Sequence, residues 1–313
     1  MIAIFFKQSK PIVFLILGIV LSILFWVETG ANHQMIFSLE SIGLIILKYL
    51  ILISVFVIFE LKIKFFEIQT GHSFVTLFFV LLFSFLIKDI LSDNTLFSFF
   101  ILSVGIIRLL NLCIGWNVKS SIFESVFLIC VASIFYKPTL VFLILVLVVT
   151  IIFTKSRWRN FIIPVLSISS FVILVQLYHL IYSESVVGYQ FFLPELNVNL
   201  QHLLNNDNIS QGVFWMACTL IFLYQIYSVK LVRSLYHRQM ASVFLAFLIL
   251  AFISMFFNDS TISGLWFMSL WPFCIYLGDF VSRIKKNLWL QVVFWGFTIA
   301  SLALYTNGLV DII

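Results

Sequence analysis

The chain alternates between long apolar runs and short polar links. A membrane-spanning helix needs about 20 mainly apolar residues, and the runs approach that length at residues 11–27, 42–61, 73–91, 95–112, 121–136, 138–154, 161–182, 212–229, 240–257, 264–281 and 288–306. We therefore predict an all-α fold, a polytopic transmembrane helical bundle of about 11 spans. Residues 1–313 are expected to form a single integral membrane domain.

The two shortest runs meet at Lys137 and Pro138 in the sequence YKP. Residues 121–136 would extend only about 24 Å as a helix, less than the roughly 30 Å of a hydrocarbon core. Proline is tolerated in the first turn of a helix, where its missing N–H has no intrahelical partner to lose. The pattern predicts a helical hairpin that turns at Lys137 and Pro138 and ends at the basic sequence KSRWRN.

The lysines and arginines in the links predict the orientation of the spans, because short cytoplasmic loops are enriched in both. With the N-terminus in the cytoplasm, the cytoplasmic links hold Lys7, Lys10, Lys62, Lys64, Arg108, Lys119, Lys155, Arg157, Arg159, Lys230, Arg233, Arg238, Arg283, Lys285 and Lys286. Only Lys48, Lys88 and Lys137 fall elsewhere. The C-terminus and the long link 183–211, which lacks lysine and arginine, are then extracytoplasmic. We expect a multi-pass protein of the inner (plasma) membrane.

Composition agrees with the pattern and excludes several classes of protein. The chain is 63% hydrophobic and 10% charged, against roughly 25% charged residues in soluble domains. The net charge of +5 comes from residues in short links, so no nucleic-acid partner is expected. The four cysteines form no CxxC, and no cysteine–histidine set has metal-ligand spacing. Walker A, GxGxxG, HExxH and GxSxG motifs are absent.

Ionisable residues inside the spans are the first candidates for function, because a charge in the bilayer is costly. These candidates are Lys48, Lys88, Asp89 and Arg108. Lys48 can alternatively reach the interface along its four-carbon stem, and Arg108 can be a simple topology anchor. Glu124 and Asp279 lie near inner ends, where we expect them to meet basic residues.

The predicted outer face is acidic, with few cations. Such a vestibule suits a lipid phosphate: Lys137 or Lys88 would hold the phosphate, and a carboxylate would act as general base or bind a divalent metal. The alternative is that outer links look acidic merely because the charge rule removes lysine and arginine from them. The sequence does not identify the ligands of such a metal, and the cofactor is therefore unknown at this point.

Two stretches resemble parts of known membrane enzymes. ASIFYKPTLVFLILVLVVTIIFTKSRWRNFIIPVL and GLWFMSLWPFCIYLGDF resemble the mid-chain hairpin and the late helix of C-fold glycosyltransferases that use lipid-linked sugars, and of polysaccharide polymerases. The whole chain is similar to an uncharacterised family of bacterial polytopic inner-membrane proteins. That family is sometimes labelled beta-carotene monooxygenase, an activity that needs a four-histidine iron site unlike the five scattered histidines here.

The glycosyltransferase resemblance implies an acidic catalytic residue in the first outer loop. Glu28 in FWVETGANHQ occupies that place. Those enzymes usually carry a pair of acidic residues there, whereas the next acidic residue of this chain is Glu40.

The sequence therefore leaves three functions open. The first is an outer-leaflet glycosyltransferase or polymerase that uses polyprenyl-phosphate-linked sugars in envelope glycan assembly, with Glu28 as base and the link 183–211 as a lid. The second is a transporter or flippase with Lys48, Asp89, Arg108 and Glu124 along its path, and the third is a non-catalytic structural subunit of a membrane complex. Membrane lipid is the expected partner in each case, and the oligomeric state is open.

Overall fold

The computed structural model describes most of the chain. The described residues are 6–7, 11–31, 39–65, 72–92, 94–115, 117–154, 158–183, 206–232, 235–254, 268–284 and 287–310. Most of the predicted link 183–211 lies outside them, although residues 206–211 already belong to a helix.

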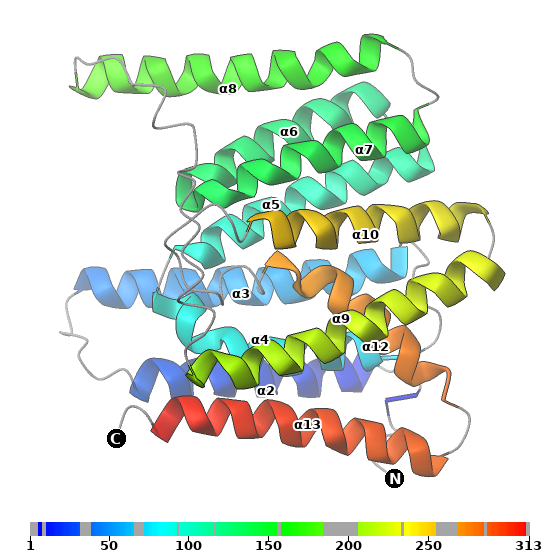
Figure 1. Ribbon diagram of the computed structural model, residues 1–313. Helices are drawn as coiled ribbons and strands as arrows, with labels where there is room; N and C mark the ends of the chain where they lie inside the picture. The colour runs from blue at the N-terminus through cyan, green and yellow to red at the C-terminus, as the bar shows by residue number, and fades with distance from the viewer. Residues whose placement is uncertain are drawn as a thin grey trace. The chain divides into compact units, whose positions relative to one another are not determined.

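The described residues form helices and no strands, which confirms the all-α class for this part of the chain. The helices are α2 (Pro11–Ala31), α3 (Leu39–Phe65), α4 (Phe74–Ser92), α5 (Thr95–Leu110), η1 (Asn111–Ile114), α6 (Val118–Phe135), η2 (Lys137–Phe142), α7 (Leu143–Phe153), α8 (Arg159–Ser183), α9 (Asn206–Val232), α10 (Leu235–Ser254), α12 (Leu270–Ser282) and α13 (Asn287–Val310) (Figure 1). Each predicted apolar run overlaps one of these helices.

Six stretches are long and apolar enough to cross a membrane, which indicates a multi-pass membrane protein. They are Pro11–Gly30, Ile42–Leu61, Thr95–Cys113, Val118–Phe135, Arg159–Tyr182 and Leu235–Ser254. The remaining apolar helices among the described residues are shorter: Phe74–Ile87, Lys137–Phe153, Phe214–Ser228, Leu270–Ser282 and Leu288–Ser301. The count of about 11 spans and the orientation of the termini stay predictions.

The helices form two compact units. The first unit holds residues 1–93, 199–237 and 262–313, and the second holds residues 94–198 and 238–261. The first unit thus contains α2, α3, α4, α9, α12 and α13, while the second contains α5, α6, α7, α8 and most of α10. The expectation of one membrane domain over the whole chain stays a prediction.

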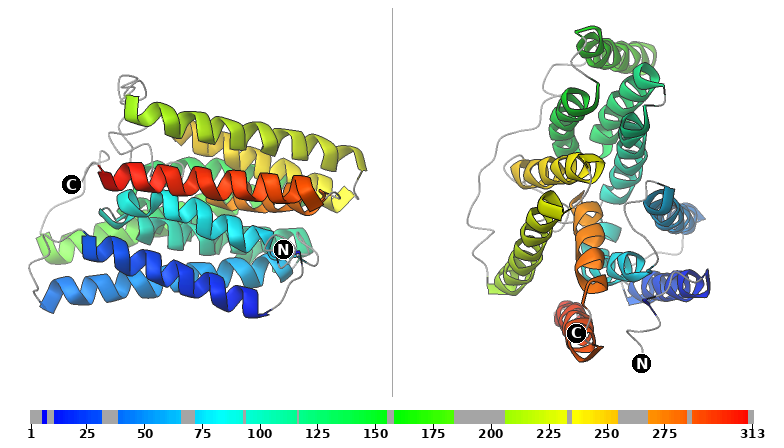
Figure 2. Two further views of the ribbon diagram at one scale, coloured as in Figure 1. Left: turned by 90° about the horizontal axis from the view of Figure 1, so that it is seen from below. Right: turned by 90° about the vertical axis from the view of Figure 1, so that its right-hand side faces the viewer.

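The core of the first unit is the pair α4 and α12, which pack side by side (Figure 2). Almost every described side chain of both helices is buried. Phe59 of α3 inserts against this pair, with its ring centroid 4.8 Å from those of Phe79 and Trp271. Helices that are apolar on all sides can be buried on all sides, so α4 and α12 occupy the centre and the longer helices surround them.

The second unit is built on α5, α6 and α8. Gly105 of α5 allows close approach to α6, because a Cβ there would lie 3.3 Å from the Cβ of Leu128. Ser98 donates from α5 to the carbonyl of Ala132 at 2.9 Å, and Ser167 donates from α8 to the carbonyl of Phe123 at 2.8 Å. Hydroxyl-to-backbone bonds of this kind hold helices together where lipid removes most of the hydrophobic driving force.

The predicted turn at Lys137 and Pro138 is present. Tyr136 ends α6 in an extended conformation (φ −149°, ψ 98°), and Pro138 lies in the first turn of η2. The hydroxyl of Thr139 donates to the Tyr136 carbonyl at 2.8 Å. This confirms the hairpin predicted from YKP and leaves the side chain of Lys137 exposed at its tip.

Candidate functional site

Glu28 is buried inside the first unit. The prediction ended the first span at residue 27, but α2 continues to Ala31, so Glu28 lies within the helix and not in a loop after it. Its side chain is only 1% exposed. It shares one face of α2 with the buried residues Val13, Leu17, Leu21 and Phe25, a spacing that keeps all of them on the side that faces neighbouring helices.

Lys48 is buried in the same unit, with 8% of its surface exposed. It shares a face of α3 with Leu52, Phe56 and Phe59, each at most 1% exposed. A lysine that reached the membrane surface would leave this face and become exposed. Lys48 instead faces the interior of the unit.

Contacts between α2 and α3 bring Glu28 and Lys48 to neighbouring levels. The hydroxyls of Ser22 and Tyr49 are 3.0 Å apart, and the rings of Phe25 and Tyr49 have centroids 5.3 Å apart. Along the helix axis Glu28 lies about 9 Å beyond Ser22, and Lys48 lies about 1.5 Å beyond Tyr49 in the same direction, so the two backbones differ in level by about 7–8 Å. Because helical side chains lean toward the N-terminus of their own helix, we expect Glu28 and Lys48 to lean toward each other across this antiparallel pair.

The backbone of α4 adds Lys88 and Asp89 at a similar level. Phe56 and Phe59 of α3 contact Phe79 of α4, with ring centroids 6.0 and 4.8 Å apart. Along these antiparallel helices, Lys48 and Asp89 each lie about two to three turns from that contact, in the same direction. The side chains of Lys88 and Asp89 lie outside the described part of the structure. We call Glu28 and Lys48, with the backbone positions of Lys88 and Asp89, the Glu28 site.

Arg108 and Lys137 belong to the second unit. Arg108 Nε lies 3.1 Å from Glu124 Oε2, with the two side chains 52% and 40% exposed. Glu124 also accepts a hydrogen bond from Ser120. This pair confirms the expectation that Glu124 meets a nearby basic residue, and it agrees with Arg108 as an anchor near a helix end.

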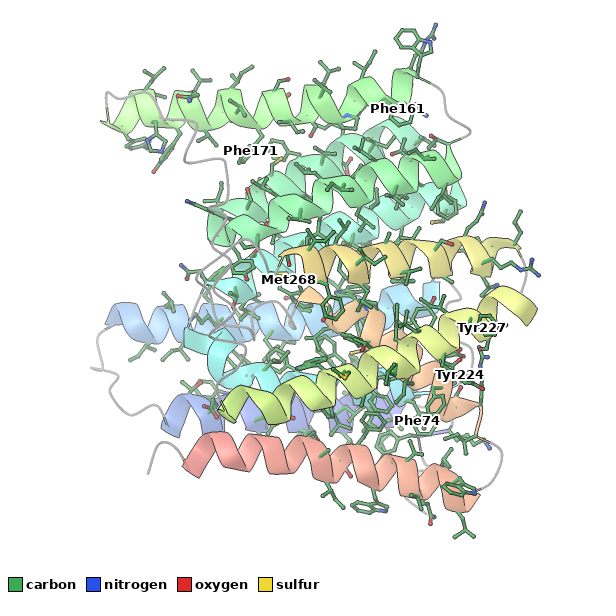
Figure 3. The ribbon with its side chains drawn as sticks, in the orientation of Figure 1. Phe74, Phe161, Phe171, Tyr224, Tyr227 and Met268 are labelled. Carbon is green, nitrogen blue, oxygen red and sulfur yellow. The ribbon has the colours of Figure 1, made fainter. Side chains whose placement is uncertain are left out.

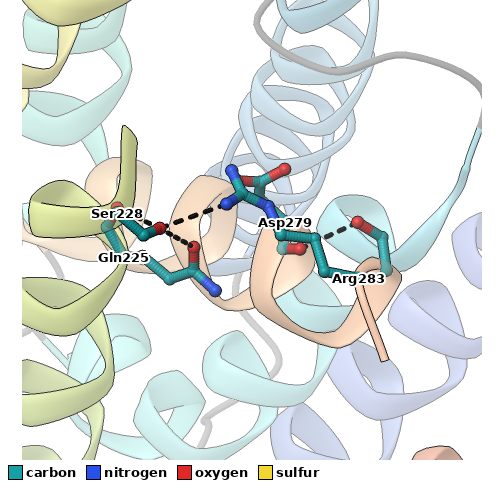
Figure 4. A network of polar contacts seen from close by, with 5 residues as sticks. Gln225, Ser228, Asp279 and Arg283 are labelled. Carbon is teal, nitrogen blue, oxygen red and sulfur yellow. Dashed lines mark hydrogen bonds and ion pairs between the residues drawn. The ribbon is translucent and has the colours of Figure 1, made fainter. Parts of the chain in front are cut away.

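A polar network joins the ends of α9 and α12 (Figure 4). Arg283 pairs with Asp279 one turn earlier and donates to the Ser228 hydroxyl at 3.1 Å. Ser228 also lies 3.2 Å from the side-chain oxygen of Gln225, which is 2% exposed. The expected partner of Asp279 is thus confirmed, whereas the sequence interpretation did not select Gln225. The sequence feature that could have indicated Gln225 is a single amide side chain inside an apolar run.

Glu60 is a second buried carboxyl group that the sequence interpretation missed. It is 8% exposed on α3 and accepts a hydrogen bond from the hydroxyl of Thr76, itself 1% exposed, on α4. Glu60 lies inside the predicted second span, 42–61, just before Lys62, but it was not selected among the ionisable residues of the spans. An acidic residue within a run such as VFVIFELKIKF was the available signal.

The described residues contain no group of three or more histidine, cysteine, aspartate or glutamate side chains arranged to hold a metal ion. No protein-family model, no curated protein and no solved structure matches the chain.

Proposed function

We propose that this chain is an outer-leaflet transferase of the inner membrane that acts on polyprenyl-phosphate-linked sugars in envelope glycan assembly. The proposal includes the predicted topology, with eleven alternating spans and a cytoplasmic N-terminus. In that topology the Glu28 site lies in the outer half of the first unit. The basic links between the spans would lie at the opposite, inner surface of the membrane.

The observation that carries the proposal is the burial of two opposite charges on neighbouring helices, Glu28 on α2 and Lys48 on α3. Taking a charge out of water is costly, and within membrane spans such residues usually mark substrate or ion sites. Lys48 could have reached the interface, but it lies on the buried face of its helix. A cation and a carboxylate held at neighbouring levels suit a substrate that carries a phosphate beside a reacting hydroxyl group.

The proposed step is a glycosyl transfer. Glu28 accepts the proton of the acceptor hydroxyl as general base, and the acceptor oxygen forms a bond to the anomeric carbon of the donor sugar. The bond from that carbon to the phosphate oxygen of the carrier breaks, and the carrier phosphate leaves with the electron pair. Lys48 holds the phosphate and stabilises its developing charge, with Lys88 on α4 as a second cation at this level.

The transport alternative has less support. It required Lys48 and Asp89 to share a path with Arg108 and Glu124. Arg108 and Glu124 pair with each other at a partly exposed position. That arrangement suits a helix-end anchor, so no specific observation favours a polar path through these residues.

The test replaces the two buried charges one at a time. Glu28→Gln and Lys48→Gln keep the approximate size of each side chain and remove its charge, and Glu124→Gln is the matched control at a carboxylate outside the Glu28 site. Each variant is expressed in the host after deletion of the gene, and the length and composition of envelope glycan are measured. The proposal expects both site variants to reproduce the deletion while Glu124→Gln restores the glycan. Full restoration by Glu28→Gln, at equal protein level, would remove the proposed base.

A further inference from the structure

An apolar groove of about 380 Å³ lies between α6 and α8 of the second unit. Its lining includes Phe127 and Ile134 of α6 and Phe171, Leu174, Tyr178 and His179 of α8. The rings of Phe127 and Phe171 meet edge to face with centroids 6.2 Å apart, and Figure 3 shows Phe171 on the side of α8 that faces α6. The groove is therefore a gap between two packed helices, and aromatic rings form part of its walls.

The two ends of α8 carry the aromatic residues that mark membrane–water interfaces. At one end Trp158 is 68% exposed and Arg159 lies over its ring, 5.9 Å from the centroid. At the other end the rings of Tyr178 and Tyr182 have centroids 4.7 Å apart. Arg159 and Tyr178 are separated by about 28 Å along a straight helix, close to the roughly 30 Å of a hydrocarbon core. If α8 crosses a bilayer, this spacing puts its two aromatic ends at the two interfaces.

The groove covers about two thirds of the depth of one leaflet. On this scale Phe171 lies near the middle of the bilayer, and Tyr178 lies about 10 Å farther along the axis. One leaflet of a core roughly 30 Å thick contributes about 15 Å. The polar atoms of the lining, on Tyr178 and His179, are both at the interfacial end, and the residues at the deep end are apolar. The groove thus matches, in length and polarity, the part of a lipid tail nearer its headgroup, with the headgroup at the Tyr178 end.

We propose that the groove holds one acyl chain of a phospholipid from the leaflet on the Tyr178 side. Leu174 and Tyr178 are 53% and 59% exposed, so the groove opens to the surroundings of α8. Those surroundings are hydrocarbon at this depth, and water has no hydrogen-bond partners along the apolar walls. An empty groove would forfeit dispersion contacts along its walls. A chain that lies parallel to the helices restores these contacts and keeps the headgroup at the interface.

The test uses the full chain in vesicles of phosphatidylcholine that contain a small fraction of phosphatidylcholine with a diazirine in the middle of one acyl chain. After irradiation, peptide mapping locates the cross-links. The proposal expects them on residues 127–134 and 171–179, and not evenly along the exposed face of α8. A parallel sample replaces the probe with a diazirine-bearing polyprenyl phosphate.

Neighbouring residues provide the matched variants. Leu174→Phe fills the groove, whereas Ile173→Phe adds the same ring at a residue that is 58% exposed and does not line it. We expect a several-fold loss of cross-linking in Leu174→Phe and no loss in Ile173→Phe. Even cross-linking along α8 in the unsubstituted protein, or equal yields from the two variants, would overturn the proposal. Cross-linking by the polyprenyl probe alone would overturn the phospholipid assignment. Mapping on the unsubstituted chain stays decisive if Leu174→Phe fails to fold.

Discussion

Gly278 of α12 lies directly against the backbone of Val75 on α4. A Cβ atom built on Gly278 would stand 2.8 Å from the Val75 nitrogen and 2.9 Å from its Cα. Backbone atoms cannot move aside as the end of a flexible side chain can. This contact therefore sets the separation of the two central helices of the first unit, in the way that small residues allow close helix packing in membranes.

Gly278→Ala is expected to destabilise the protein by about 1–3 kcal/mol or more, because the added methyl group overpacks this contact. The midpoint of thermal unfolding in detergent measures the effect. Gly296→Ala is the control, because a Cβ at that residue of α13 meets nothing within 4 Å. It should be neutral or stabilise the helix by up to about 1 kcal/mol. Equal midpoints for the two variants would contradict the close packing of α12 on α4.

Thr76→Val is expected to destabilise the first unit because it removes the hydroxyl that donates to Glu60. A buried polar group that loses a hydrogen-bond partner costs about 1–3 kcal/mol. Thr150→Val is the matched control at a threonine that is 0% exposed and whose hydroxyl bonds only the Val146 carbonyl of its own helix. That local bond contributes little. Unfolding midpoints should fall more for Thr76→Val, and the reverse order would contradict the role of this interhelical bond.

The positions of the helices could be predicted from the sequence, but the faces they bury could not. Hydropathy locates each apolar run because lipid accepts apolar side chains on every side. For the same reason α3 shows no polar stripe: exposed Leu47 and buried Leu52 are the same residue type. The inward direction of Lys48 and Glu60 depends on which helices surround α3, and periodicity does not encode this.

The ends of the helices could not be predicted from the hydropathy pattern either. The first predicted run stops at residue 27 because Glu28 interrupts it, yet α2 continues to Ala31. A helix keeps its backbone hydrogen bonds past the last apolar residue, whereas a hydropathy window ends there. For this reason Glu28, which was predicted to lie in a loop, lies on the buried face of a helix in the structure. The turn at Pro138 was predictable, because proline constrains the backbone locally whatever surrounds it.

Loss of the Arg108–Glu124 pair is expected to have a small effect. The side chains are 52% and 40% exposed, and exposed ion pairs contribute about 0–1 kcal/mol. A double-mutant cycle with Arg108→Ala and Glu124→Ala should give a coupling below about 1 kcal/mol that shrinks as salt rises. A much larger coupling that is insensitive to salt would indicate a desolvated pair and would revive a functional role for Arg108.

The predicted topology can be tested at the two ends of α6. Lys119 and Lys137 are both exposed and lie on opposite sides of the membrane if α6 crosses it. Each is replaced by cysteine in a chain that carries Cys113→Ser, because Cys130, Cys218 and Cys274 are buried and should react slowly. We expect a membrane-impermeant maleimide to label Lys137→Cys in intact cells and to label Lys119→Cys only after permeabilisation. The reversed result would invert the topology and turn the Glu28 site toward the cytoplasm. Labelling of both from outside would mean that α6 does not cross the membrane, and the alternation of all later spans would be wrong.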